Sequence, residues 1–226
     1  MRKIRKKNKE SDAEEALIHL PDQFKDFAAG AYKELLEHRT ILINGDIEED
    51  SIERVLIQIK KMSANKPKEP ITILINSVGG YVFEAQAIID QMQQTKTPIT
   101  TIALGKVMSA AFAIYLAGDY RVCGRNSIFL VHNGSEDLGE VKLGDAIVEA
   151  DFSKKLLESY ARYYASRTNV SHKEWLEIFN SNVDHYYFAE DAKKMGIVHD
   201  ISEPQLSKYR PKFKKKPHRV KSHRKA

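Results

Sequence analysis

Short apolar runs alternate with segments of helical periodicity along most of this chain. TILING (40–45) ends in Asn-Gly, and ITILIN (71–76) is followed by SVGG, so each reads as a buried strand closed by a turn. Further strands are predicted at 99–104, 120–123 and 127–131 and in GIVHDI (196–201).

Amphipathic spacing predicts helices between these strands. In 50–62, apolar residues from Ile52 to Ile59 follow i, i+3, i+4, i+7 spacing, and Asp50 or Ser51 is the expected N-cap. Further helices are predicted at 81–95, 109–117, 143–167, 171–180 and 188–196. This alternation of strands and helices favours an α/β fold with parallel strand pairing.

Charge separates an acidic body from two basic ends. Residues 1–9 carry six Lys/Arg and residues 208–226 carry ten, and neither segment has an acid. Without those sixteen charges, the chain's net +5 becomes −11. Like-charge blocks without apolar periodicity are typical of disorder. We therefore predict a charged N-terminal extension at 1–18, one domain at 19–207, and a disordered basic tail at 208–226 whose charge suits acidic partners.

The remaining composition narrows the location and the chemistry. The chain has 226 residues and one cysteine, Cys123, which suits a reducing compartment. No apolar segment follows MRKIRKKNKE, and the run Val107–Ala117 is too short to span a bilayer. We therefore expect a soluble, cytoplasmic protein. No nucleotide, dinucleotide or metal motif is present, so no cofactor and no metal are expected.

Ser109 is the first candidate for catalysis. It follows the strand ITTIAL through GKVM and opens the predicted helix SAAFAIYLAG. A serine there is either an ordinary N-cap or a nucleophile at the positive end of a helix dipole. Upstream, SVGG is either a tight turn or a segment whose backbone N–H groups face a ligand. With the N–H after Ser109, such a donor would form an oxyanion hole.

A base and an acid are the partners that such a serine needs. His132 directly follows the strand SIFLV, a usual place for a general base, although a half-buried structural histidine fits the same pattern. An acid would orient its imidazole. Asp184 precedes an aromatic run that could bury it. The four candidate acids are Asp119, Asp145, Asp184 and Asp191.

Three long stretches resemble the proteolytic subunit of the Clp protease, ClpP. The likeness in order, spacing and flanks runs from about Tyr32 to Ile201. The stretches are ILINSVGGYVFEAQAIIDQM (73–92), ALGKVMSAAFAIYLAGDYRVCGRNSIFLVHNG (103–134) and NSNVDHYYFAEDAKKMGIVHDI (180–201). The resemblance implies a spiral of β-β-α units related to the crotonase fold, with a protruding helical handle. It also implies a Ser-His-Asp endopeptidase that cleaves peptides and unfolded proteins inside two stacked seven-membered rings.

Carried over by position, the resemblance implies a role for each site residue. Ser109 would be the nucleophile, His132 the base and Asp184 the acid, and the N–H groups of Gly79 and Ala110 would form the oxyanion hole. The handle would comprise NGSEDLGEVKLGD and the helix at 145–167, with GEVKLG (139–144) as an edge strand near the substrate.

The chain departs from the family pattern at several places. Val78 replaces the usual proline of the Gly-Gly turn, and His132 is followed by Asn133-Gly134 instead of Gln-Pro. Met108 and Ala110 to Phe112 differ from the family's residues around the nucleophile, which changes the expected pocket lining. Residues 1–18 do not resemble the axial loop that engages an ATPase unfoldase, which weakens the expectation of a Clp-type ATPase partner.

Three alternatives to a triad peptidase remain open on sequence alone. One is a catalytically silent, structural or regulatory paralogue that keeps the ring. Another is an acyl-CoA enzyme of the crotonase fold. The third is a peptidase that uses a Ser-Lys dyad, for which Lys106 is the nearby lysine.

Overall fold

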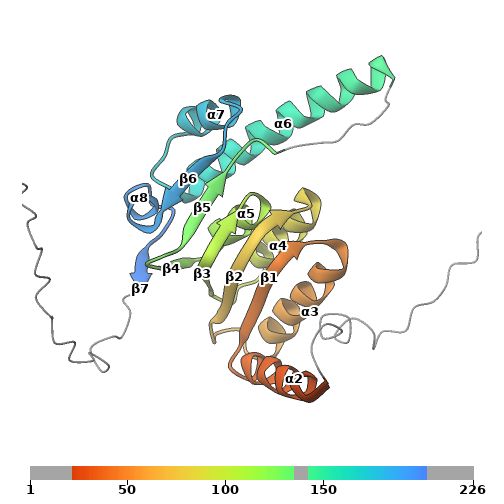
Figure 1. Cartoon of the computed structure of the whole chain (residues 1–226), viewed down its shortest axis with the longest axis vertical. Helices are drawn as coiled ribbons and strands as arrows, with labels where there is room; N and C mark the ends of the chain where they lie inside the picture. The colour runs from red at the N-terminus through yellow and green to blue at the C-terminus, as the bar shows by residue number, and fades with distance from the viewer. Residues whose placement is uncertain (1–21, 135–141, 203–226) are drawn as a thin grey trace, which may run out of the picture.

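The structure, a computed structural model, describes residues 22–134 and 142–202. The predicted extension at 1–18 and tail at 208–226 lie outside these residues, as does the first half, 139–141, of the predicted edge strand at 139–144. The strand prediction is wrong for residues 143 and 144, because they form the start of a helix. Within them, strands and helices alternate as the sequence predicts (Figure 1).

Seven strands of the described residues form one sheet. Its order is β1-β2-β3-β4-β7, with β5 beside β3 and β6 beside β5. All pairs are parallel except β5 with β6. The strands are β1 (Thr40–Ile47), β2 (Ile71–Gly80), β3 (Ile99–Met108), β4 (Tyr120–Gly124), β5 (Ile128–Val131), β6 (His185–Phe188) and β7 (Asp200–Ser202).

Helices pack against this sheet, and one of them extends beyond it. Figure 1 shows α3 and α4 packed side by side on the sheet, and α6 projecting past it as a handle. The observed arrangement is the predicted α/β fold with a protruding helix. The helices are α2 (Asp22–Glu37), α3 (Glu49–Asn65), α4 (Val82–Gln94), α5 (Ala110–Leu116), α6 (Leu143–Arg167), α7 (His172–Asn180) and α8 (Ala189–Lys194).

Two details of the helices differ from the sequence prediction. Helix α2 was not predicted, although Tyr32, Leu35 and Leu36 have the i, i+3, i+4 spacing that indicates one. The predicted caps Asp50 and Ser51 are wrong, because α3 already begins at Glu49.

Strands β1, β2 and β3 are longer than predicted because each continues through an irregularity. The predicted ends at 45, 76 and 104 lie where the β1–β2 and β2–β3 registers shift. Gly45 and Gly105 have φ of +90° and +70°, a backbone that glycine adopts without strain. These glycines bend the strands instead of ending them, and SVGG completes β2.

The bend in β3 lets one strand pair with two neighbours on the same side. Thr100 to Ala103 pair with β4, and Lys106 to Met108 pair with β5. Because β3 and β5 are parallel, their carboxyl ends lie at the same edge of the sheet. Ser109 follows one of these ends and His132 follows the other.

The centre of the core is α5. All seven of its residues are buried, as expected for a helix that is apolar on every side. The Phe112 ring packs against the rings of Phe129, Tyr164 and Trp175, with centroids 5.1–6.2 Å apart. Ser109 therefore precedes a helix that β5, α6 and α7 hold in place.

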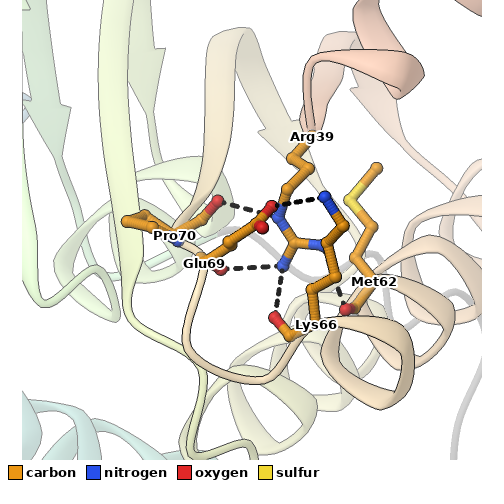
Figure 2. A network of polar contacts seen from close by, with 5 residues as sticks. All are labelled: Arg39, Met62, Lys66, Glu69 and Pro70. Atoms are coloured by element: carbon orange, nitrogen blue, oxygen red, sulfur yellow. Dashed lines mark hydrogen bonds and ion pairs between the residues drawn. The ribbon is translucent and has the colours of Figure 1, made fainter.

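Arg39 holds together the segments around the start of β1, at the α2 end of the molecule. Its guanidinium donates to the backbone carbonyls of Met62, Lys66, Glu69 and Pro70, which lie in and after the last turn of α3 (Figure 2). Arg39 has φ +54°, so the chain turns sharply between α2 and β1 at this residue. The contacts tie the start of β1 to the α3–β2 connection.

Candidate active site

Ser109 occupies the N-cap position of α5 without acting as a side-chain cap. Its hydroxyl makes no capping hydrogen bond, and its backbone has φ +53° and ψ −125°, a conformation that L-residues rarely adopt. The Ser109 N–H donates to the carbonyl of Leu130 at 3.0 Å. This hydrogen bond to β5 helps to keep Ser109 in its strained conformation. Backbone strain of this kind is concentrated at active sites and ligand-binding sites.

His132 is in direct contact with Ser109. Its Nε2 lies 2.7 Å from the Ser109 Oγ, a hydrogen-bond distance. The contact follows from strand pairing, because Met108 is opposite Leu130 in the β3–β5 register. The imidazole side chain is 26% exposed, so it remains partly accessible to solvent.

Asp184 stands on the other side of the imidazole. Its Oδ1 lies 3.6 Å from His132 Nδ1, and its side chain is 53% exposed. The antiparallel β5–β6 register ends with Val131 opposite His185, which brings the next residue on one strand, His132, to the preceding residue on the other, Asp184. The possibility that the aromatic run buries Asp184 is wrong, because Tyr186 and Phe188 point outward and are exposed.

The other three candidate acids have different surroundings. Asp119 Oδ2 accepts the Ile99 N–H at 2.8 Å, and Asp191 pairs with Lys194. Asp145 lies in the first turn of α6. Only Asp184, of these four, contacts His132.

Gly79 lies against Ser109. It has φ +103°, and a Cβ there would meet Met108 O and Ser109 Cβ at 2.8 Å and Ala110 N at 3.0 Å. Glycine is therefore required for the close approach of β2 to the start of α5. The Gly79 N–H donates to Ser77 Oγ at 3.0 Å, and Ser77 is fully buried. Sequence reasoning missed this internal hydrogen bond.

A small apolar cavity of about 70 Å³ opens beside Ser109 and His132. Its far wall is formed by Leu156 and Tyr160 of α6 and by the buried Tyr164 and Phe179. Burial raises the pKa of the Tyr160 and Tyr164 phenols, so both stay neutral at physiological pH. The cavity therefore offers a neutral, mainly apolar lining next to the serine.

Two asparagines that sequence reasoning did not connect flank the histidine and the acid. Asn133 Nδ2 donates to Asn182 Oδ1 at 2.6 Å, and Asn182 has φ +55°. The contact could have been found only from the β5–β6 register, because 49 residues separate the two.

The described residues contain a second serine–histidine contact. Ser181 Oγ lies 2.7 Å from His185 Nε2, but the Ser181 hydroxyl also lies 2.6 Å from the Ile178 carbonyl and donates to it. That hydroxyl proton is directed to a carbonyl and not to the imidazole. A short Ser–His distance alone therefore does not identify a nucleophile.

Residues 22–134 and 142–202 contain no group of three or more His, Cys, Asp or Glu side chains that could hold a metal ion. None of the helices in these ranges is long and apolar enough to cross a membrane.

Comparison with known proteins shows which family the chain belongs to. The family model described as Clp protease matches residues 25–205. An ATP-dependent Clp protease proteolytic subunit of Deinococcus radiodurans is 27% identical over 172 residues, covering 75% of this chain and 83% of that protein. An ATP-dependent Clp protease proteolytic subunit 3 of Rhodococcus jostii is 28% identical over 182 residues, covering 79% and 87%.

A solved structure extends the agreement to three dimensions. A ClpP1 mutant from Listeria monocytogenes superposes with a TM-score of 0.69 at 28% identity, covering 77% of this chain and 97% of that one. With the family model spanning most of the chain, this establishes that the protein belongs to the Clp protease family as a ClpP-like proteolytic subunit.

Proposed function

We propose that this protein is a serine endopeptidase that cleaves peptides and unfolded proteins with Ser109, His132 and Asp184. The observation that carries the proposal is the 2.7 Å contact between Ser109 Oγ and His132 Nε2, made by a serine whose strained backbone precedes a buried helix. This arrangement presents an oxygen nucleophile next to a base.

The steps of the reaction follow from the positions of these groups. With Nδ1–H directed to Asp184, His132 Nε2 accepts the Ser109 proton as Oγ attacks the peptide carbonyl. The Asp184 carboxylate stabilises the resulting imidazolium. His132 then protonates the leaving amine, and water, deprotonated by the same imidazole, releases the acyl group from Ser109.

The developing oxyanion needs donors near Ser109. Ala110 is the first residue of α5, and Gly79 packs against its backbone nitrogen. This proximity supports the N–H groups of Gly79 and Ala110 as the oxyanion hole. Because the Gly79 N–H donates to Ser77 Oγ in this state, it must share or exchange that partner when the oxyanion forms. Removal of one such donor typically costs about 10²–10³ in kcat.

The apolar cavity supports a preference for one type of side chain at the substrate residue that precedes the cleaved bond. Its neutral lining and volume of about 70 Å³ suit a modest apolar side chain and disfavour a charged one.

We also propose that the subunit works in stacked rings, which the resemblance implies to be heptameric. Ile147, Val148 and Phe152 on the projecting half of α6 are 42–66% exposed, and Phe152 packs on the exposed Phe83. Apolar side chains in such numbers on one helix suit contact with another copy. A Clp-type ATPase that supplies unfolded substrate is the weaker part of this proposal, because residues 1–18 do not resemble the family's axial loop. The single cysteine, Cys123, supports a cytoplasmic location.

Fluorophosphonate labelling followed by peptide mapping tests the proposal. We expect the probe to label Ser109 in the wild-type protein and to leave Ser181 unlabelled. The His132→Ala variant should lose the label, because the hydroxyl has no base. A Lys106→Met variant should keep it, because the Lys106 side chain is exposed and the contacts described for this residue are made by its backbone.

Other outcomes would favour the alternatives. An assembled wild-type protein that the probe does not label would point to a catalytically silent paralogue or to an acyl-CoA enzyme. Loss of labelling in Lys106→Met with retention in His132→Ala would point to a Ser-Lys dyad.

A further inference from the structure

The acid of the site is attached less firmly than the nucleophile. The Asp184 side chain is 53% exposed, and its Oδ1 lies 3.6 Å from His132 Nδ1. Exposed ion pairs are weak, so this contact alone does little to hold the two side chains together. Something else must therefore keep the Asp184 loop against the His132 loop.

Strand pairing brings the two loops together but stops before the catalytic residues. The last pair of the β5–β6 ladder is Val131 with His185, so His132 and Asp184 are the first residues outside it. Just beyond them, Asn133 Nδ2 donates to Asn182 Oδ1 at 2.6 Å. In the part of the chain that the structure describes, this is the side-chain hydrogen bond that joins the two loops.

The far side of the Asp184 loop is fixed to α7. Ser181 Oγ donates to the Ile178 carbonyl at 2.6 Å and lies 2.7 Å from His185 Nε2. Asn182 follows with φ +55°, which an asparagine tolerates better than most residues. The loop is therefore held at its start by α7, and its approach to His132 depends on the side chain of Asn182.

We propose that Asn133 and Asn182 are positioning residues, whose mutual hydrogen bond holds the Asp184 carboxylate at the His132 imidazole. The role rests on the proposed function. Without the bond, the acid spends less time in contact with His132, and the imidazolium formed during attack on substrate loses its stabilisation. Asn133 lines the cavity beside Ser109, but the hydrogen bond described for each asparagine is to the other asparagine and not to the Ser109 hydroxyl or the His132 ring.

Two substitutions at Asn182 separate this role from backbone effects. Asn182→Gly keeps the positive φ accessible but removes the acceptor. Asn182→Asp keeps an acceptor oxygen for Asn133 Nδ2 and also tolerates this backbone conformation. Asn133→Ala removes the donor from the other side.

The experiment measures fluorophosphonate labelling of Ser109, with kinact and KI determined separately, and the melting temperature of each full-length variant. We expect Asn182→Gly and Asn133→Ala to lower kinact about three- to tenfold, the factor that one net hydrogen bond is worth, with KI within about twofold. The double variant should be no slower than the slower single one, because both remove the same bond. Asn182→Asp should label within about twofold of the wild type.

Asn44→Ala is the matched control. It removes another exposed Asn–Asn hydrogen bond, from Asn76 Nδ2 to Asn44 Oδ1 at 2.7 Å, between β1 and β2. Its labelling rate should equal that of the wild type.

The positioning role is overturned if Asn182→Gly and Asn133→Ala label at the wild-type rate. It is equally overturned if Asn182→Asp is as slow as Asn182→Gly, or if the losses of the two single variants multiply in the double variant. A wild-type protein that does not label at all refutes the proposed function itself, and the positioning role with it.

Discussion

The two contacts of His132 are built in opposite ways. On one side, Nε2 meets a serine that β3–β5 pairing, Gly79 and the buried helix α5 hold in place. On the other, Nδ1 faces Asp184 on an exposed loop, 3.6 Å away. The Ser109 side is held by the buried core, whereas the Asp184 side is held by the end of the β5–β6 pairing and an exposed loop.

This difference predicts which parts of the site tolerate substitution without moving. A strained serine persists because the fully buried α5 and its aromatic neighbours over-determine its backbone. The acid has no such support, so small changes at the surface can move it. We therefore expect substitutions on the nucleophile side to have large effects and those on the acid side to have graded ones.

The largest effect should come from Ser109→Ala. We expect peptide hydrolysis to fall at least about 10⁴-fold, because the attacking oxygen is lost. The unfolding free energy should change by no more than about 1 kcal/mol, since the hydroxyl caps nothing in α5. Initial rates with a fluorogenic peptide and urea unfolding measure the two quantities. Residual hydrolysis that Ser181→Ala then removes would contradict the assignment of Ser109.

Gly79→Ala should damage both activity and stability. The new Cβ would lie 2.8 Å from Met108 O and Ser109 Cβ, at a residue with φ +103°. We expect kcat/KM to fall at least about 100-fold, as for a lost oxyanion donor, and the unfolding free energy to fall by about 1–3 kcal/mol.

Gly30→Ala is the control for that substitution. Gly30 lies in α2 with nothing within 4 Å of an added Cβ, so this variant should keep full activity. If Gly79→Ala retained normal kcat/KM, the nucleophile side would be more adaptable than the structure indicates.

Asp184→Asn should have an intermediate effect. Because the carboxylate is half exposed and not closely hydrogen-bonded, we expect kcat to fall about 10- to 100-fold, well short of the loss in Ser109→Ala. Steady-state kinetics at constant ionic strength measure the loss. A fall of 10⁴-fold or more would show that the two sides of His132 are equally preorganised and would remove the distinction.

Much of the fold could be predicted from the sequence, because apolar runs and helical spacing are local signals. The bounds of α6, 143–167, are the same in prediction and structure. The strands β1 to β3 were predicted too short, since Gly45, Gly79 and Gly105 also give the local signal of a turn. Whether a glycine ends a strand or bends it depends on the neighbouring strand, which local spacing does not reveal.

The site divides in the same way. Ser109 and His132 could be proposed from their places after predicted strands, and the structure brings them together. Asp184 could be chosen among four acids only through resemblance to a family, because its place opposite His132 comes from antiparallel pairing between β5 and β6. The Asn133–Asn182 contact and the Gly79–Ser77 hydrogen bond need the same three-dimensional information.

The smallest effect should arise away from the site, at His199 beside β7. Burial lowers the pKa of His199, and the nearby Arg121 and Arg167 lower it further. The neutral Nδ1 accepts the Arg121 backbone N–H at 3.1 Å. The neutral His199 therefore contributes fully to the folding stability above pH 6.5, the ordinary pKa of histidine. This stabilisation is lost as the pH falls through the lower pKa of His199 in the folded state.

A variant of His199 tests whether the pH dependence of stability comes from the scaffold or from the exposed His132–Asp184 pair. His199→Asn keeps a short acceptor but cannot become protonated, so its urea midpoint should fall less than that of the wild type between pH 7.5 and 5.5. The difference should be small, because His199 is exposed and solvent screens its charge. Equal slopes for the two proteins would exclude His199 as a source. If Asp184→Asn flattened the slope instead, the exposed His132–Asp184 pair would be contributing to folding, and the acid side would be more firmly built than its 3.6 Å separation indicates.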